Sequence, residues 1–281
     1  MIGQAQMCSK FADLHVHSSF SDGTFSPQAI VTQARKAGLA CISITDHDTV
    51  DAIDPALKAS GPELEVLTGI ELTAESKGQE IHILGYLFDH KDLDFLKMLK
   101  DMQDIRVKRI YEICKKLKEH KVVIEPHDIF DLAGGGSIGR LHVARALYKR
   151  GHVGSIAEAF YRYIGDKSPA YVGKFKMTPK EAIGWILKVK GVPVLAHPYT
   201  LDDSALISDF VKAGIMGIEV FYAEHSGYQK KEFIKIAEKY NLLLTGGSDC
   251  HGEAKEEVRM GKVKLPYEYV EKLKEARCKL M

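Results

Sequence analysis

Residues 13–23 read DLHVHSSFSDG, and this stretch combines a strand pattern with three potential ligands. His15 and His17 are separated by one residue, and Asp22 precedes a glycine. Side chains alternate between the two faces of a strand, so both imidazoles face the same side of it. A buried strand has little reason to carry two imidazoles on one face. The stretch therefore indicates a site at the end of the first strand.

Segments of strand and helix character alternate on both sides of a central region. SPQAIVTQARKAG (26–38) predicts a helix with Ser26 as N-cap, Pro27 in the first turn and Gly38 after its end. Strands separated by helices imply a parallel sheet, and their number favours a closed (β/α) barrel over an open sheet. The predicted strands are FADLHVH, LACISITD, ELEVLTGIELTAES, GQEIHILGYLFD, VPVLAHP, GIEVFYA and LLLTGGSDCH.

The central region, residues 93–170, has a different texture. LDFLKMLKDMQDIRVKRIYEICKKLKEH places Leu, Met, Ile and Val at helical spacing, and PHDIFDLA and RLHVARALYKRG continue as shorter helices. No segment here has a convincing strand pattern. We therefore expect residues 93–170 to form an all-helical insertion, and residues 1–92 and 171–281 to form one barrel.

The composition excludes several classes of protein. A formal net charge of +1 over 281 residues provides no strong field toward nucleic acid or membranes. The 5 cysteines contain no C-x-x-C pair, so neither a zinc finger nor a disulfide framework is indicated. No stretch approaches the roughly 18 apolar residues of a membrane span. We expect a cytoplasmic protein with no membrane partner and no obligate protein partner.

Histidines and carboxylates follow several of the predicted strands. In a (β/α) barrel the carboxyl ends of the strands meet at one mouth, so these side chains should converge. If they were buried without partners, each of these side chains would cost roughly several kcal/mol of folding free energy. Divalent cations remove this cost because they take imidazole and carboxylate as ligands. Their nitrogen and oxygen donors fit two or three ions of zinc, manganese or iron. The converging residues are His15, His17, Asp46, His47, Glu71, His82, His197, Asp249 and His251.

A metal cluster of this kind activates a bridging hydroxide and binds the oxygens of a phosphoryl group, which predicts hydrolysis of a phosphate ester. The motifs DLHVHSSFSDG, ITDHDTVDA, GIE, IHILGY, VLAHP and GGSDCHG resemble those of the PHP (polymerase and histidinol phosphatase) family of metal-dependent phosphoesterases. They run from residue 13 to 252, over nearly the whole chain. The resemblance implies a distorted seven-stranded (β/α) barrel with a trinuclear metal centre.

The resemblance also implies which side chains hold which ion. One ion would be held by His15, His17 and Asp249, with Glu71 bridging to a second. The second would also take His82 and His197, and the third would take Asp22, His47 and His251. Cys250 lies between two of these residues and points away from them, into the core.

Within the family, the chain is similar to the subgroup often labelled TrpH or YciV-like, whose helical insertion carries a GR-x-H-x-A element, here residues 139–144. The subgroup includes hydrolases of 3′,5′-nucleoside bisphosphates, a 5′-3′ exoribonuclease activity on short RNA and a cyclic-phosphate phosphodiesterase. We therefore expect a small phosphorylated substrate, most simply a nucleotide, with short RNA and cyclic phosphates as alternatives. A helical cap over the barrel mouth would supply substrate contacts and exclude water.

Five further side chains are candidates for catalysis or substrate binding. Arg140 opens a helix after a glycine-rich loop, where helix N–H groups and a guanidinium favour phosphate; the alternative is a solvated arginine. His142 either binds phosphate or caps the helix. Lys174 and Lys176, in a Lys-Phe-Lys run where nucleotide-bisphosphate members often have His-Lys-Trp, either bind a second phosphate or lie on the surface. His225 would contact phosphate or protonate the leaving oxygen.

Two readings compete with the phosphoesterase. Amidohydrolase-like enzymes also place H-x-H on a first barrel strand, but their site does not need Asp22, His47 and His251 together. A non-catalytic barrel that binds a partner is the other reading, and it would be expected to have lost ligands. None is missing here.

Overall fold

The computed structural model describes residues 10–173, 177–255 and 257–281. Its strands join in one sheet of 8 strands in the order β7-β6-β5-β4-β3-β2-β1-β8. They are β1 (Phe11–Val16), β2 (Cys41–Ile44), β3 (Glu65–Ser76), β4 (Gln79–Tyr86), β5 (Val192–Leu195), β6 (Gly217–Tyr222), β7 (Leu243–Gly247) and β8 (Leu265–Pro266).

The sheet curls into a nearly closed barrel because the ends of β1 and β7 meet. The N–H of Asp249 donates to the carbonyl of His15 at 2.8 Å, and the N–H of His17 donates to that of Cys250 at 2.9 Å. Gly247 permits this approach, since a Cβ there would lie 2.3 Å from the Cβ of His15. The seven main strands of the predicted barrel are confirmed, and the two-residue β8 adds an antiparallel edge beside β1.

One feature of the sheet differs from the sequence prediction, which had every strand parallel. β4 runs antiparallel to both β3 and β5. A tight turn at Lys77 and Gly78, both with positive φ, joins β3 to β4 without a helix between them. A two-residue connection can only return the chain antiparallel. The start of β4 consequently lies beside the end of β3, and His82 pairs with Thr73 at the barrel mouth.

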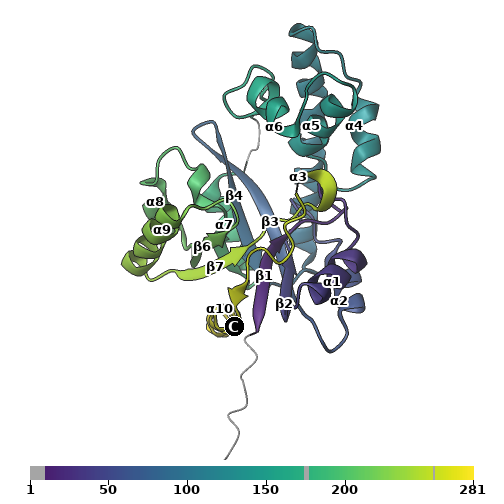
Figure 1. Cartoon of the computed structure of the whole chain (residues 1–281). Helices are drawn as coiled ribbons and strands as arrows, with labels where there is room; N and C mark the ends of the chain where they lie inside the picture. The colour runs from purple at the N-terminus through teal and green to yellow at the C-terminus, as the bar shows by residue number, and fades with distance from the viewer. Residues whose placement is uncertain (1–9, 174–176, 256) are drawn as a thin grey trace, which may run out of the picture.

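Helices cover the outside of the barrel (Figure 1). The Ser26 hydroxyl accepts the N–H of Ala29, which confirms the predicted N-cap of the first helix. None of the described helices is long and apolar enough to cross a bilayer. The barrel helices are α1 (Pro27–Lys36), α2 (Ile53–Ser60), α7 (Pro179–Lys188), α8 (Leu206–Ala213), α9 (Gly227–Tyr240) and α10 (Glu268–Cys278), with 3₁₀ turns at Pro198–Thr200 and Gly252–Ala254.

Between β4 and α7 the described residues form only helices: α3 (Leu93–Glu119), α4 (Pro126–Ala133), α5 (Arg140–Lys149), α6 (Ile156–Ala159) and a π-helical turn, Phe160–Ile164. Figure 1 shows α4, α5 and α6 grouped beyond the tips of β3 and β4. We call this group, with the second half of α3, the cap. The cap has its own core, to which Ile110 and Ile113 of α3 belong, whereas Phe95 and Leu99 pack in the barrel core. Thus α3 contributes side chains to both cores, and the division of the chain at residue 93 stays a prediction.

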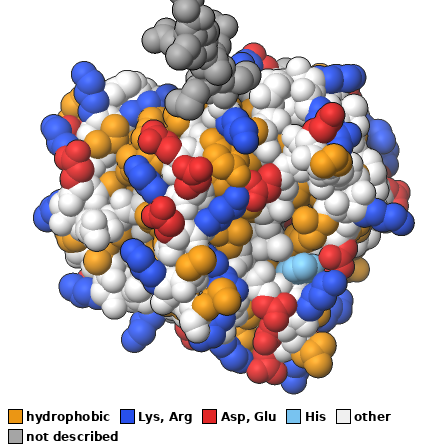
Figure 2. All heavy atoms as spheres, turned by 90° about the horizontal axis from the view of Figure 1, so that it is seen from below, with side chains coloured by type: hydrophobic (Ala, Val, Ile, Leu, Met, Phe, Trp, Pro, Cys, Tyr) orange, Lys and Arg blue, Asp and Glu red, His pale blue; other side chains and the backbone are white. Residues whose placement is uncertain are grey.

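The end of the barrel away from the cap is shown in Figure 2. Lysine, arginine, aspartate and glutamate side chains alternate there with hydrophobic ones, and no broad area of this face has a single sign. This mixed surface agrees with the near-zero net charge. The concentration of histidine and carboxylate lies at the opposite end.

Candidate metal centre

The carboxyl ends of β1, β2, β5 and β7, with the middle of β3 and β4, bring the predicted ligands together at the barrel mouth. Donor atoms of eight of them fall into three groups whose members lie within 4.8 Å of one another, and Nε2 of the ninth, His197, lies 3.0 Å from Oε1 of Glu71. The groups are His15, His17 and Asp249; His17, Asp22, His47 and His251; and His47, Glu71 and His82.

The first group lies where β1 meets the end of β7. Oδ1 of Asp249 is 3.1 Å from Nε2 of His17 and 3.5 Å from Nε2 of His15. Its other oxygen, Oδ2, accepts a hydrogen bond from the Tyr222 hydroxyl at 2.8 Å and forms an ion pair with Nζ of Lys255 at 2.8 Å. One oxygen of Asp249 is therefore held by neighbours while the other faces the imidazoles.

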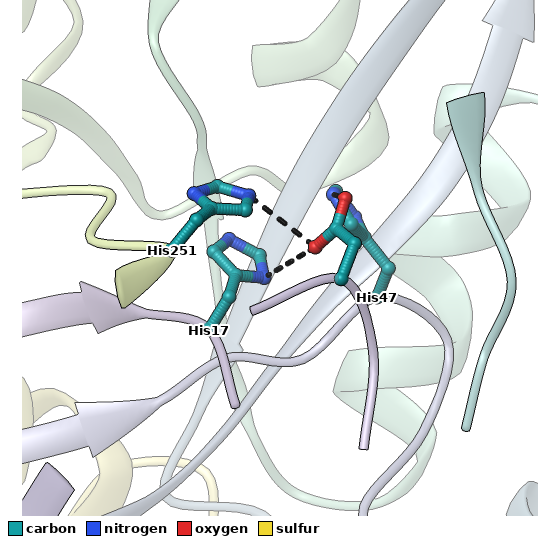
Figure 3. Close-up of side chains that lie close together, drawn as sticks. His17, His47 and His251 are labelled. Carbon is teal, nitrogen blue, oxygen red and sulfur yellow. Dashed lines mark ion pairs between the residues drawn. The ribbon is translucent and has the colours of Figure 1, made fainter. Parts of the chain in front are cut away.

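The second group surrounds Asp22, in the loop after β1. Oδ1 of Asp22 is 3.3 Å from Nε2 of His251 and 3.7 Å from Nδ1 of His17, and Oδ2 is 3.8 Å from Nε2 of His47. Figure 3 shows the rings of His17 and His251 turned toward one carboxylate oxygen, with His47 on its other side. Residues from three separate parts of the chain thus converge on this carboxylate.

The third group centres on Glu71 of β3. Oε1 of Glu71 is 2.9 Å from Nδ1 of His82 and 3.0 Å from Nε2 of His197. Oε2 faces the other two groups, at 3.2–3.3 Å from nitrogens of His15, His17 and His47. The two oxygens of Glu71 therefore face different sets of imidazoles.

The donors of this centre fit divalent cations. All are imidazole nitrogens or carboxylate oxygens, the ligands that zinc, manganese and iron take. Oδ1 of Asp22 and Nδ1 of His47 are buried, and although Nε2 of His251 and Oε2 of Glu71 lie 3.3 Å and 3.2 Å from them, neither atom makes a hydrogen bond among the described residues. Burial would raise the pKa of Glu71, but His47 and His82 hold it well below its usual range. An anionic carboxylate among imidazoles, with donors left over, is the electrostatic pattern that a bound cation completes.

A cavity of roughly 920 Å³ opens above these groups. Metal-group residues form its floor, and residues of α3, α5, α6 and the π-helical turn form the facing wall. That wall carries three arginines and an apolar strip. Among its residues are Arg106, Arg109, Arg140, Leu141, Ile156 and Phe160, and Tyr199, Glu224, Lys255 and Arg259 complete the rim.

A family model described as "PHP domain" matches residues 13–168 of this chain. The chain belongs to the PHP family. It is 32% identical to a 5′-3′ exoribonuclease of Haemophilus influenzae, over 85% of this chain and 89% of that protein. It is 30% identical to a 3′,5′-nucleoside bisphosphate phosphatase of Chromobacterium violaceum, over 85% of this chain and 86% of that protein. The predicted family is thereby confirmed, and both relatives are named for cleaving phosphate esters.

The barrel and cap also match a solved structure. A protein from Bifidobacterium adolescentis, described as a metal-dependent phosphoesterase, superposes with a TM-score of 0.87 at 29% identity. The match covers 95% of this chain and 96% of that one. The similarity therefore includes the cap as well as the barrel.

One carboxylate that the sequence did not single out, Glu219 of β6, holds two of the candidate ligands in place. Oε1 of Glu219 accepts Nδ1–H of His15 at 3.0 Å, and Oε2 accepts the N–H of His197 at 2.9 Å. Asp46, which we expected among the converging ligands, instead accepts hydrogen bonds from Ser18 and Ser21 and belongs to none of the three groups. It stabilises the loop that carries Asp22. Glu219 lies mid-strand in GIEVFY, where no local pattern marks it.

Two ligand candidates have strained backbones. His197 has a φ of 24° and Asp249 a φ of 52°, values that side-chain-bearing residues rarely adopt. Such conformations cost roughly 1–3 kcal/mol and persist where the surroundings hold them. At His197 the bond from its N–H to Glu219 does so. The strain turns both side chains into the mouth at the ends of their strands.

The predicted substrate contacts have different outcomes. Arg140 opens α5 and lines the cavity, but its guanidinium already pairs with Glu80 at 3.1 Å and Asp166 at 2.5 Å. The solvated-arginine alternative does not hold, since this side chain is 14% exposed. Lys174 and Lys176 lie outside the described residues.

The two remaining histidines do not reach the cavity wall. Nδ1 of His142 accepts the N–H of Gly139 at 3.1 Å, which supports the helix-capping alternative. Nδ1–H of His225 donates to the carbonyl of Val220 at 2.9 Å, and the residue is 4% exposed. Neither is among the residues that line the cavity. The ring of His225 packs against Tyr199, Tyr222 and Phe233, and its Nε2 is buried with no hydrogen-bond partner among the described residues, so its proton-transfer role stays a prediction.

Proposed function

We propose that this chain hydrolyses a phosphate ester of a small nucleotide, with a 3′,5′-nucleoside bisphosphate as the first substrate to test. One observation supports this most: three overlapping groups of histidine and carboxylate form the floor of a single cavity, and arginines form the opposite wall. A floor that binds cations and a basic wall suit a substrate with two phosphates. The curated relative with that substrate in its name is 30% identical.

The ligands would be shared among two or three divalent ions, of manganese, zinc or iron. His15, His17 and Asp249 would hold one, with Glu71 bridging to a second that also contacts His82 and His197. Asp22, His47 and His251 would hold the third. Ions bound there would supply Lewis acidity, which activates water for attack on phosphorus and offsets charge on the phosphoryl oxygens.

The chain's own residues would orient the substrate. Lys255, which lines the cavity and contacts Asp249, lies where a phosphoryl oxygen above the first group would need a donor. Arg140 faces the cavity from the start of α5, where a second phosphate could exchange with its carboxylate partners. Leu141 and Phe160 offer an apolar surface to the base or sugar. The cap covers the mouth and limits water, which strengthens these electrostatic contacts.

A second candidate is 5′-3′ hydrolysis of short RNA. The relative that is 32% identical is named a 5′-3′ exoribonuclease and aligns over 85% of this chain. The same metal groups would cleave the terminal phosphodiester, and the rest of the bound RNA would extend out of the cavity along the rim, past Tyr199. A cyclic-phosphate diester is the third ester in the test below.

The experiment is an assay of purified protein loaded with Mn²⁺. Adenosine 3′,5′-bisphosphate, a nucleoside cyclic phosphate and a short 5′-phosphorylated RNA are offered separately, and phosphate, nucleotide and shortened RNA are quantified. A D22N variant is the control for contaminating phosphatase. Turnover of the bisphosphate above the other two supports the proposal. Absence of turnover of every phosphoester, with metal shown to be bound, would refute it and revive the non-catalytic reading.

Metal stoichiometry separates the phosphoesterase from an amidohydrolase-like enzyme. More than two ions per chain supports the phosphoesterase, because the third set, Asp22, His47 and His251, is then occupied.

We also propose a cytoplasmic location. The four cysteines in the described residues are unpaired, and three of them are buried, which suits a reducing compartment.

A further inference from the structure

Glu80 occupies a position between the metal groups and the cap. It lies near the start of β4, and its side chain is 9% exposed in the cavity wall. Its two oxygens contact three side chains from three different elements. No motif singled it out in the sequence, since it reads as an ordinary polar residue after a turn.

On the metal side, Oε1 of Glu80 lies 3.0 Å from Nε2 of His82. The other ring nitrogen, Nδ1, lies 2.9 Å from Oε1 of Glu71 and faces the third group. A carboxylate on one ring nitrogen keeps the proton there and leaves the lone pair of the other for a cation. Glu80 therefore determines both the tautomer and the orientation of His82.

On the cap side, the same carboxylate binds two arginines. Oε1 is 3.1 Å from Nη2 of Arg140 on α5, and Oε2 is 2.9 Å from Nη2 of Arg109 on α3. Arg109 is itself anchored, because its Nε–H donates to the carbonyl of Val172 at 2.7 Å. The orientation of the carboxylate thus depends on where two cap helices lie.

We propose that Glu80 is a positioning residue that couples the cap to the metal group around Glu71. It orients His82 toward the ion, and Arg109 and Arg140 orient Glu80. A shift of α3 or α5, or an anion that draws Arg140 away from Glu80, therefore changes the metal affinity of this group. Because such coupling is reciprocal, metal binding changes the affinity for that anion by the same factor. This proposal rests on the metal centre of the proposed function but not on its substrate.

The test measures Mn²⁺ binding to the full chain in the absence of substrate. Calorimetry gives the affinities, and elemental analysis gives the number of bound ions. The E80Q variant keeps the shape of the side chain and removes its charge. We expect the Mn²⁺ affinity of the site that includes His82 to fall about 10–100-fold, with the affinity of the other sites unchanged. E224Q is the matched control, since Glu224 lines the same cavity and pairs with Arg259 but contacts no metal-group residue among those described. Its Mn²⁺ affinity should equal that of the wild type.

A second variant tests the coupling to the cap. R109M removes one support of Glu80 without touching His82, and we expect a several-fold loss of affinity at the same class of site. The absorption spectrum of Co²⁺-loaded protein provides a further readout, because a reoriented His82 changes the ligand field of one ion, whereas a general loss of stability does not. Both variants should keep the wild-type far-UV circular dichroism.

Wild-type Mn²⁺ affinities and Co²⁺ spectrum in E80Q would overturn the proposal, as would equal weakening of every site. Weakening in E80Q with no change in R109M would overturn the link to the cap. Should E80Q fail to fold, the R109M result decides. Because no substrate is present, failure of the phosphoesterase assay would leave these outcomes unaffected.

Discussion

Arg106 offers a sharp test of how the cap helix α3 is held against the barrel. Its side chain is 4% exposed, and Nε lies 2.7 Å from Oδ2 of Asp48, which is fully buried. Its Nη2 donates to the Thr73 hydroxyl at 2.6 Å, and Nη1 donates to the carbonyl of Ile138 at 3.1 Å. One guanidinium thus joins α3 to the loop after β2, to β3 and to the loop before α5.

The R106M variant should destabilise the protein strongly. Methionine fills much of the volume but leaves the Asp48 carboxylate buried without its guanidinium, and breaking a buried ion pair from one side costs about 3–5 kcal/mol. For a protein of this size each kcal/mol lowers Tm by about 2–4 °C, so a fall of roughly 10 °C is expected. R162M is the matched control, because Arg162 is 46% exposed and its ion pair with Glu158 is worth little.

The assay is urea unfolding of metal-free wild type, R106M, D48N and the double variant. Because D48N removes the charge that R106M would strand, the double variant should be at least about 2 kcal/mol more stable than the sum of the single effects predicts. A loss below about 1 kcal/mol in R106M, or additive effects, would refute the reasoning that this pair is desolvated and coupled.

Three further predictions follow from the described contacts. In G247A, a methyl group 2.3 Å from the Cβ of His15 should force β1 and β7 apart, and bound Mn²⁺ should fall together with Tm; wild-type values for both would contradict the account of barrel closure. Burial holds the pKa of His142 at about 4, below its ordinary 6.5, so the folded state resists protonation and stability is lost as the pH falls from 6.5 toward 4. This contribution to the loss of unfolding free energy should reach about 2 kcal/mol at pH 5, relative to neutral pH, and be absent in H142N. Urea unfolding of both proteins at pH 5 and at neutral pH measures it, and identical pH profiles for the two proteins would count against it. H251N should bind one ion fewer per chain than the wild type, by elemental analysis, whereas H152N, altered on the cap surface, should bind the full number; equal stoichiometries would remove His251 from the ligand set.

Much of the metal centre could be predicted from the sequence because its signals are local. Two histidines with period two on a strand share a face whatever surrounds them, and strands that alternate with helices place their carboxyl ends at one mouth. The helical character of residues 93–120 likewise follows from apolar spacing along the chain. These inferences need only strand and helix geometry, together with the ligands that cations prefer.

What only the tertiary structure decided was the set of partners behind those residues. Glu219 contacts His15 across 204 residues of sequence, and no pattern within GIEVFY distinguishes it from a strand residue facing solvent. The same is true of Glu80, which pairs with the guanidinium of Arg140, and of His225, whose ring packs against Tyr222 and Phe233. A side chain's type and periodicity are properties of its own segment, whereas its charge partners depend on which distant segments the fold brings within 3 Å or so of it. The sequence by itself determined where ligands gather, and the packing of cap on barrel decided what holds them in place.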